Sequence, residues 1–127
     1  MALSTNKLDE IVKGFIRKLA DEIPVEEAIL FGSYARGNAK EYSDIDLAII
    51  SDWFRGRPYI ENMQYLSLRA AYHNSLIEAL PFTVEEYRKL DKRTLIASIV
   101  NTGRKYQVDK KNRQQRRGRS KGEAVIG

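Results

Sequence analysis

The sequence contains no cysteine, only one histidine and no long apolar run. The absence of cysteine excludes disulfide bonds and thiolate metal sites, and it suits a reducing cytoplasm. No apolar stretch approaches the ~20 residues that a helix needs to cross a bilayer. The first ten residues also lack the basic and then apolar pattern of a signal peptide. We therefore expect a soluble, cytoplasmic protein that does not associate with membranes.

The positive charge of the chain is concentrated near its C-terminus. The formal net charge of the 127 residues is +5, yet residues 104–127 hold nine Lys or Arg and two acids, a net charge of +7. From residue 110 the sequence KKNRQQRRGRSKGE also lacks apolar residues, so it cannot form a core. We expect a folded domain over residues 1–107 and a basic, flexible tail over residues 108–127. Nucleic-acid binding by this tail stays an alternative that we do not favour. Single-strand recognition uses aromatic side chains on which bases stack, and the last aromatic residue of the chain is Tyr106, before the tail.

Apolar periodicity predicts that helices and strands alternate along the domain. The spacing of apolar residues from Leu8 to Ile23 predicts a helix that Ser4 or Thr5 caps and Pro24 closes. Three later helices are expected: one from Tyr59 to about His73, one that begins after a capping box of Thr83 and Glu86, and one from Leu95 to Gly103. Strands are expected over residues 25–31, 45–50 and 76–82, and Pro81 is expected to end the last of them. This order predicts an α/β (α+β) fold with a small mixed sheet flanked by helices.

The segment FGSYARGNAKEYSDIDLAII, residues 31–50, contains features typical of a phosphate site. Gly32 and Ser33 follow an apolar strand, where a residue without Cβ lets backbone N–H groups approach an anion. Arg36 lies one helical turn later and could face the same anion, or pair with Glu41 or Asp44. The sequence therefore predicts that a short helix or turn after Gly32 contacts phosphate.

Three carboxylates are the candidate metal ligands. Asp44 and Asp46 are two residues apart at the start of a strand, so both side chains project to the same face. Glu78 lies within the apolar strand SLIEALPF, where a charge is costly unless it reaches a cation or the edge of the sheet. Carboxylates held this close repel one another unless a cation lies between them, and Mg²⁺ prefers such oxygen ligands.

The motif GSYARG followed by SDIDL resembles the signature of the minimal nucleotidyltransferases, in the polymerase-β superfamily. The resemblance implies a polymerase-β-type fold and a transferase that moves a nucleoside monophosphate, AMP from ATP by preference, onto a hydroxyl. It implies two Mg²⁺ ions bound by Asp44, Asp46 and Glu78, although the family usually has Asp at the third position. The nucleotide-binding positions implied by the motif are Gly32, Ser33, Arg36, Gly37 and Ser43.

The family resemblance also implies a partner. Minimal nucleotidyltransferases often pair with a helical HEPN protein, and several act as antitoxins that nucleotidylate this ribonuclease toxin. We therefore expect a complex with such a partner, or a homodimer. Trp53 and Phe54 are expected to be core or interface residues, with base stacking as the alternative, and both are considered with Tyr59 as exposed contacts of the partner. A binding module that neutralises its partner by docking, with an idle catalytic site, is the alternative.

Other polar and aromatic residues have less specific expectations. His73, the only histidine, is expected to be structural or exposed rather than catalytic. Tyr34 and Tyr42 flank the phosphate segment, and we expect both to pack against the domain, with contact to a nucleobase as the alternative.

Overall fold

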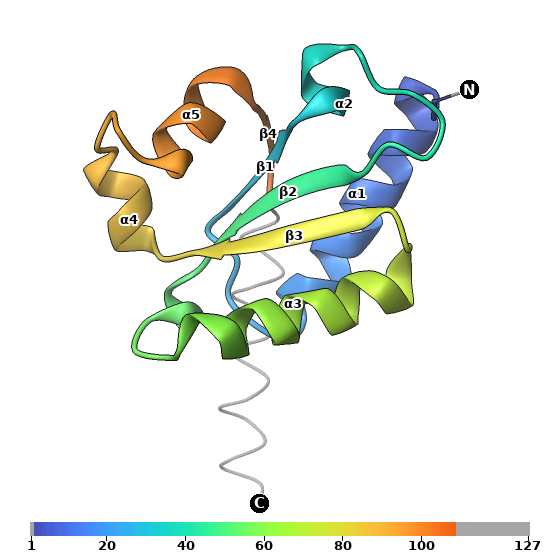
Figure 1. Cartoon of the computed structure of the whole chain (residues 1–127). Helices are drawn as coiled ribbons and strands as arrows, with labels where there is room; N and C mark the ends of the chain where they lie inside the picture. Colours follow the sequence, from blue (N-terminus) through green and yellow to red (C-terminus); the bar gives the residue numbers. More distant parts are fainter. Residues whose placement is uncertain (1, 109–127) are drawn as a thin grey trace, which may run out of the picture.

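The computed structural model describes residues 2–108 (Figure 1). The elements follow in the order α1 (Thr5–Ala20), β1 (Glu27–Phe31), α2 (Ser33–Arg36), β2 (Ile45–Ile50), the 3-10 turn η1 (Asp52–Phe54), α3 (Tyr59–His73), β3 (Ile77–Phe82), α4 (Val84–Lys89), α5 (Leu95–Thr102) and β4 (Arg104–Tyr106). None of the helices in this part of the chain is long and apolar enough to span a membrane. Apart from residue 108, the basic tail lies outside the described residues.

The four strands form one mixed sheet in the order β3-β2-β1-β4. β1 pairs antiparallel with both β2 and β4, whereas β2 and β3 run parallel. Parallel neighbours require a crossover connection, and α3 supplies it between β2 and β3 (Figure 1). The predicted fold class, a small mixed sheet flanked by helices, is confirmed.

The two faces of the sheet carry separate cores. On one face the buried residues Ile45, Leu47 and Ile49 of β2 pack with α1 and α3. On the other face Ala48 and Ile50 pack with Ile96 and Ile99 of α5 and with the start of α4. Figure 1 shows α4 and α5 gathered toward one end of the sheet, the end at which β2 and β3 finish. The second face is therefore covered at this end only, and the beginnings of β2 and β3 remain accessible on it.

The helix boundaries follow the capping residues more closely than the apolar pattern. Ser4 caps α1, with its Oγ accepting a hydrogen bond from the Lys7 N–H at 3.2 Å. The helix ends at Ala20, before the predicted limit at Pro24, and Ile23 is buried beyond its end. The predicted capping box of Thr83 and Glu86 at the start of α4 is confirmed.

Pro81 does not end the third strand, contrary to the sequence-based expectation. β3 continues through Pro81 to Phe82, and these residues pair with Ile49 and Ile50 of β2. Because β3 is an edge strand, one side of its backbone needs no partner for its N–H groups. A proline, which lacks an N–H, is tolerated at such a position.

The fourth strand was missed by the sequence analysis. β4 is only three residues long and includes two exposed cations, so it shows no apolar run. Its pairing with β1 stabilises it, together with Tyr106, which is buried and donates a hydrogen bond from its hydroxyl to Asp9 at 2.5 Å. Only the fold brings Asp9 and Tyr106 together, because 97 positions separate them in the sequence.

Candidate active site

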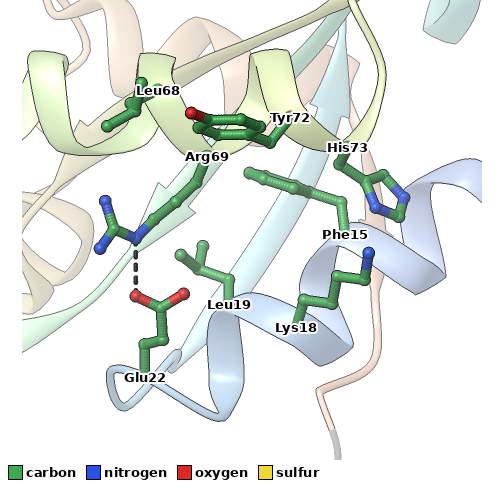
Figure 2. A pocket seen from close by; sticks show the side chains of 8 residues that line it. All are labelled: Phe15, Lys18, Leu19, Glu22, Leu68, Arg69, Tyr72 and His73. Atoms are coloured by element: carbon green, nitrogen blue, oxygen red, sulfur yellow. Dashed lines mark hydrogen bonds and ion pairs between the residues drawn. The ribbon is translucent and has the colours of Figure 1, made fainter.

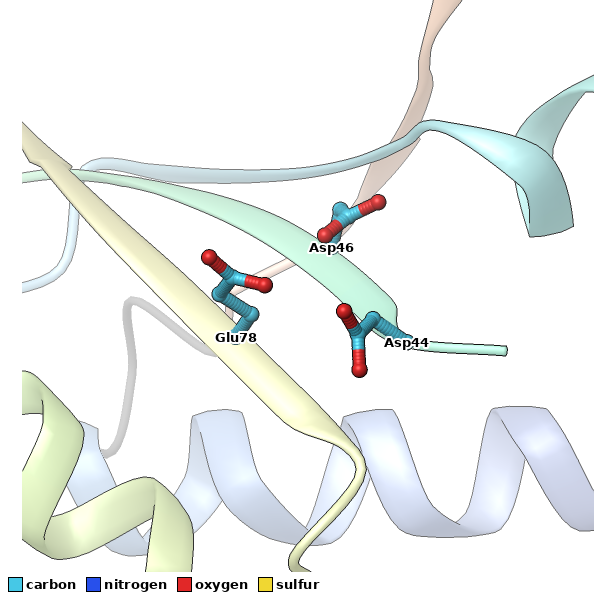
Figure 3. Close-up of side chains that lie close together, drawn as sticks. All are labelled: Asp44, Asp46 and Glu78. Atoms are coloured by element: carbon cyan, nitrogen blue, oxygen red, sulfur yellow. The ribbon is translucent and has the colours of Figure 1, made fainter. Parts of the chain in front are cut away.

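Asp44, Asp46 and Glu78 lie together at the accessible end of the sheet (Figure 3). Asp44 directly precedes β2, Asp46 is its second residue, and Glu78 is the second residue of β3. The register of the parallel strands places Asp46 directly beside Glu78. Each of the three carboxylates offers an oxygen within 4.8 Å of the other two.

Side chains along β2 alternate between the two faces of the sheet, and this alternation places Asp46 on the face opposite its buried neighbours. Ile45 and Leu47 are completely buried toward α1 and α3, so Asp46 between them projects from the opposite face. Figure 3 shows the three carboxylates on the side of the strands that faces away from these helices. Asp44 and Glu78 are exposed and Asp46 is partly buried, so a ligand from solvent can reach all three.

The electrostatics of the triad favour a bound cation. Burial, followed by the negative charges of Glu78 and Asp44, raises the pKa of Asp46 from its ordinary value of 3.8 to about 6. Arg36 opposes this shift through its positive charge but does not cancel it. At neutral pH the site therefore concentrates negative charge that the described residues do not neutralise fully.

Gly32 provides the space that the Asp46 carboxylate occupies. The register of β1 with β2 pairs Phe31 with Asp46, which brings the next residue, Gly32, against the acid. Gly32 has φ +74° and ψ −154°, a conformation that is essentially restricted to glycine. A Cβ built on Gly32 would lie 2.1 Å from Asp46 Oδ2. Glycine is therefore required at this position for two independent reasons, neither of which the sequence alone indicates.

The short helix α2 follows Gly32 directly. Ser33 is its first residue and Arg36 its last, and Gly37 ends it in the left-handed conformation with φ +78°. The Gly37 N–H and the Asn38 N–H both bond to the Ser33 carbonyl, so the tight turn after the helix is fixed. The structure thus places Gly32 beside Asp46, with Ser33 the next residue along the chain.

Ser43 has a structural role that the motif did not suggest. Its Oγ accepts a hydrogen bond from the Lys40 N–H at 2.7 Å, and its own N–H bonds to the Lys40 carbonyl at 3.0 Å. These two bonds close a turn over residues 40–43, immediately before Asp44. Ser43 therefore helps to fix the backbone from which Asp44 projects.

The carboxylate triad fits divalent metal ions. Hard cations such as Mg²⁺ bind carboxylate oxygens and complete their coordination with phosphate oxygens and water. The triad supplies such oxygens from three residues, and burial together with the negative charges of Glu78 and Asp44 raises the pKa of Asp46 in spite of Arg36. The residues present therefore fit a divalent metal ion.

The remaining candidate residues lie outside this constellation. His73 contacts the Ile11 carbonyl through Nε2 at 3.0 Å and packs against Phe15, so its role is structural as expected. Phe54 is buried, which confirms the expectation of a core residue and contradicts that of an exposed partner contact. Trp53 is half-buried between Tyr65 and the Arg57 guanidinium, whereas Tyr59 is exposed.

A pocket of about 300 Å³ lies between α1 and α3, on the other side of the sheet (Figure 2). Phe15 and Leu19 of α1 line it, together with Leu68 and Tyr72 of α3. A hydrogen-bonded ion pair of 2.6 Å between Arg69 Nε and Glu22 closes one side. This pocket is separate from the carboxylates, because α1 and α3 cover the opposite face of the sheet.

The structure thus combines a mixed sheet flanked by helices with an accessible carboxylate triad, next to a glycine turn and a short helix. The chain belongs to the nucleotidyltransferase domain family, whose model matches residues 12–122.

Relatives of known name agree with this family. Two proteins of Methanocaldococcus jannaschii carry the name "Putative protein adenylyltransferase": MJ1305 is 50% identical over 46 residues, and MJ1215 is 30% identical over 78 residues. The match to MJ1305 covers 36% of this chain and only 30% of that protein, whereas the match to MJ1215 covers 56% of this chain and 91% of that protein.

Solved structures share the fold at low sequence identity. A "putative nucleotidyltransferase" from Sulfolobus solfataricus has a TM-score of 0.61 and 18% identity, over 83% of this chain and 84% of that chain. A toxin–antitoxin complex with AMP-PNP contains a chain with a TM-score of 0.52 and 17% identity, over 93% of this chain and 87% of that chain. At this identity the likeness shows the fold alone.

Proposed function

We propose that the chain transfers a nucleoside monophosphate, AMP from ATP, to a hydroxyl group in a reaction that depends on Mg²⁺. The observation that carries this proposal is the convergence of Asp44, Asp46 and Glu78 on the accessible end of the sheet. The three acids are held together although burial, followed by the charges of Glu78 and Asp44, raises the pKa of Asp46. Membership of the nucleotidyltransferase family supports the reaction type.

The proposed reaction is an in-line displacement at the α-phosphorus. The acceptor oxygen forms a bond to this phosphorus, the bond to the bridging oxygen of the β-phosphate breaks, and pyrophosphate leaves. Two Mg²⁺ ions held by the triad would neutralise the phosphate charge and lower the pKa of the acceptor hydroxyl.

Residues of the site also bind the triphosphate, fix the backbone of the site and accept the proton of the hydroxyl. The backbone of Gly32 and Ser33 binds the triphosphate, and the positive charge of Arg36 assists, since it already acts on Asp46. The turns that Gly37 and Ser43 fix hold these groups in place. Glu78 lies at the exposed margin, where an acceptor from solvent arrives, and its carboxylate takes up the hydroxyl proton.

We propose that the acceptor hydroxyl belongs to a partner protein, a helical toxin of the HEPN type. Asp44 and Glu78 are exposed on the face of the sheet that α4 and α5 leave open, so a folded protein can present a side chain to the triad. The names of the relatives refer to adenylylation of proteins, and a toxin–antitoxin protein shares the fold.

Docking without catalysis is the second candidate function, and one surface favours it. α3 exposes the apolar side chains of Ile60, Leu68 and Tyr72, which lie along one side of the helix at intervals of four or eight residues. The pocket between α1 and α3 adjoins Leu68 and Tyr72 (Figure 2). A partner bound to this surface could be neutralised without use of the carboxylates.

Transfer of label from α-labelled ATP to the protein encoded beside this chain tests the main proposal. Wild-type protein with Mg²⁺ should label the partner, and the double variant Asp44→Asn/Asp46→Asn should not. Asp21→Asn, an exposed acid at the end of α1, is the matched control and should retain labelling. If the double variant still neutralises the partner as well as wild type does, docking is the function and the enzymatic proposal is rejected.

A further inference from the structure

Tyr42 is an exposed aromatic residue beside the carboxylate triad. Its side chain is 81% exposed, so the packing role expected from the sequence is wrong. Only one residue separates it from Asp44, which limits the distance between the two Cα atoms to about 7 Å. Tyr34, on the other side of the same segment, does pack against the core, and its hydroxyl accepts a hydrogen bond from the Leu3 N–H at 3.1 Å.

The backbone of Tyr42 is in an unfavourable conformation. Its φ is +69°, in the left-handed region that glycine and asparagine occupy much more readily than tyrosine. The two hydrogen bonds between Lys40 and Ser43 close the turn around it and hold this geometry. A side chain so exposed contributes little packing that could offset the strain, so the fold does not explain a tyrosine here.

The other exposed tyrosines of the described residues lie away from the triad, and the tryptophan packs against other side chains. Tyr59 and Tyr72 are exposed, but they belong to α3 on the opposite face of the sheet. The Trp53 ring packs against Tyr65 with centroids 4.4 Å apart, and the Arg57 guanidinium lies 3.9 Å from its centroid. Phe31 pairs with Asp46 but packs against the core on that face. Among the exposed aromatic residues that the structure describes, Tyr42 is therefore the one beside the carboxylates.

We propose that Tyr42 stacks on the base of the bound nucleoside triphosphate and gives the site a preference for purines. The inference rests on the proposed function, since it requires the triphosphate to bind at Gly32, Ser33 and the triad. Base–aromatic stacking needs only an accessible ring face, and a purine offers a larger π surface than a pyrimidine. The strained turn would hold the ring at the rim of the site before the nucleotide arrives.

Nucleotide affinity, measured by titration calorimetry with Mg²⁺, tests the inference. Tyr42→Asn suits the left-handed backbone and removes the ring, whereas Tyr42→Trp keeps an aromatic ring. We expect Tyr42→Asn to bind ATP about tenfold more weakly than wild type and Tyr42→Trp to bind it within about twofold. Tyr72→Ala, which removes an equally exposed tyrosine from α3, should leave ATP affinity unchanged.

A second pair of probes separates base contact from a general change in the loop. Wild type should bind ATP more tightly than UTP, and Tyr42→Asn should lose most of this difference. Inorganic tripolyphosphate, which has no base, should bind wild type and Tyr42→Asn equally. Equal loss of ATP and tripolyphosphate affinity in Tyr42→Asn would overturn the inference, as would unchanged ATP affinity. If wild-type protein prefers ATP to UTP but transfers no label to the partner, the proposed function is rejected and the base contact is retained.

Discussion

The Asp46 carboxylate occupies the space that a side chain at Gly32 would need: a Cβ on the glycine would lie 2.1 Å from Asp46 Oδ2. Gly32 directly follows β1 and Asp46 lies in the neighbouring strand β2. Their approach follows from the antiparallel register that pairs Phe31 with Asp46. The turn that begins at Gly32 and the strand that carries Asp46 are therefore sterically coupled. A change in one must displace the other.

Gly32→Ala should disrupt the site and destabilise the fold. The new Cβ forces the Asp46 carboxylate to move, and the glycine-type backbone conformation adds a cost of about 1–3 kcal/mol in the free energy of unfolding. Gly56→Ala is the control, because Gly56 also has a positive φ, of +77°, but no atom lies within 4 Å of the added Cβ. Chemical denaturation should show both variants destabilised, whereas label transfer should be lost only in Gly32→Ala. Retention of transfer in Gly32→Ala would contradict the coupling.

The stability of the metal-free protein should depend on pH through Asp46. Its pKa is about 6 in the folded protein and near 3.8 in the unfolded chain, so the folded state binds the proton more tightly. Between about pH 4 and pH 6 the free energy of unfolding should therefore fall as pH rises, and above this range the loss is complete. The loss is less than about 3 kcal/mol, because solvent screens this partly exposed group.

Asp46→Asn provides the matching comparison. In the presence of a chelator this variant should have a higher Tm than wild type at pH 8 and the same Tm at pH 4. Mg²⁺ should raise the Tm of wild type more at pH 8 than at pH 5, since deprotonated carboxylates bind the ion. A Tm of Asp46→Asn below that of wild type at pH 8, without metal, would show that repulsion in the triad does not destabilise the fold.

Glu78→Gln should reduce the rate of transfer rather than nucleotide binding. Loss of a metal ligand at the acceptor side removes several kcal/mol of transition-state stabilisation, a decrease in kcat on the order of 10³-fold. The KM for ATP should change much less, because Asp44 and Asp46 remain. Initial rates at varied ATP concentration measure both constants, with Glu61→Gln on α3 as a control that behaves like wild type. A large rise in KM with unchanged kcat would place Glu78 in ground-state binding instead.

The α3 surface should determine complex formation independently of catalysis. Leu68→Glu together with Tyr72→Glu places two charges in the exposed apolar surface beside the pocket, and should weaken binding of the partner at least about tenfold. Nucleotide affinity should be unaffected because α3 lies on the opposite face of the sheet from the triad. Size-exclusion chromatography and ATP titration provide the two measurements, and Lys7→Glu, an exposed charge change on α1, is the control. Normal co-elution of the double variant with the partner would exclude this surface.

Helix caps and strands that depend on the spacing of neighbouring residues were predictable from the sequence. The Ser4 cap, the capping box of Thr83 and Glu86, and the apolar run of β2 depend on short-range spacing, and the structure has each of them. β4 and the passage of β3 through Pro81 were not predictable in this way. Both depend on position in the sheet: β4 exists because β1 offers it an open edge, and Pro81 is tolerated because β3 is itself an edge strand.

By itself the sequence determined which residues could form the site, because Asp-x-Asp on a strand directs two carboxylates to one face whatever surrounds them. The tertiary structure decided everything that joins separate segments: the register that sets Glu78 beside Asp46, the contact of Gly32 with that acid, and the exposure of Tyr42. The physical reason is that strand register and burial arise from long-range pairing between segments, while side-chain alternation and helix capping arise within a few residues.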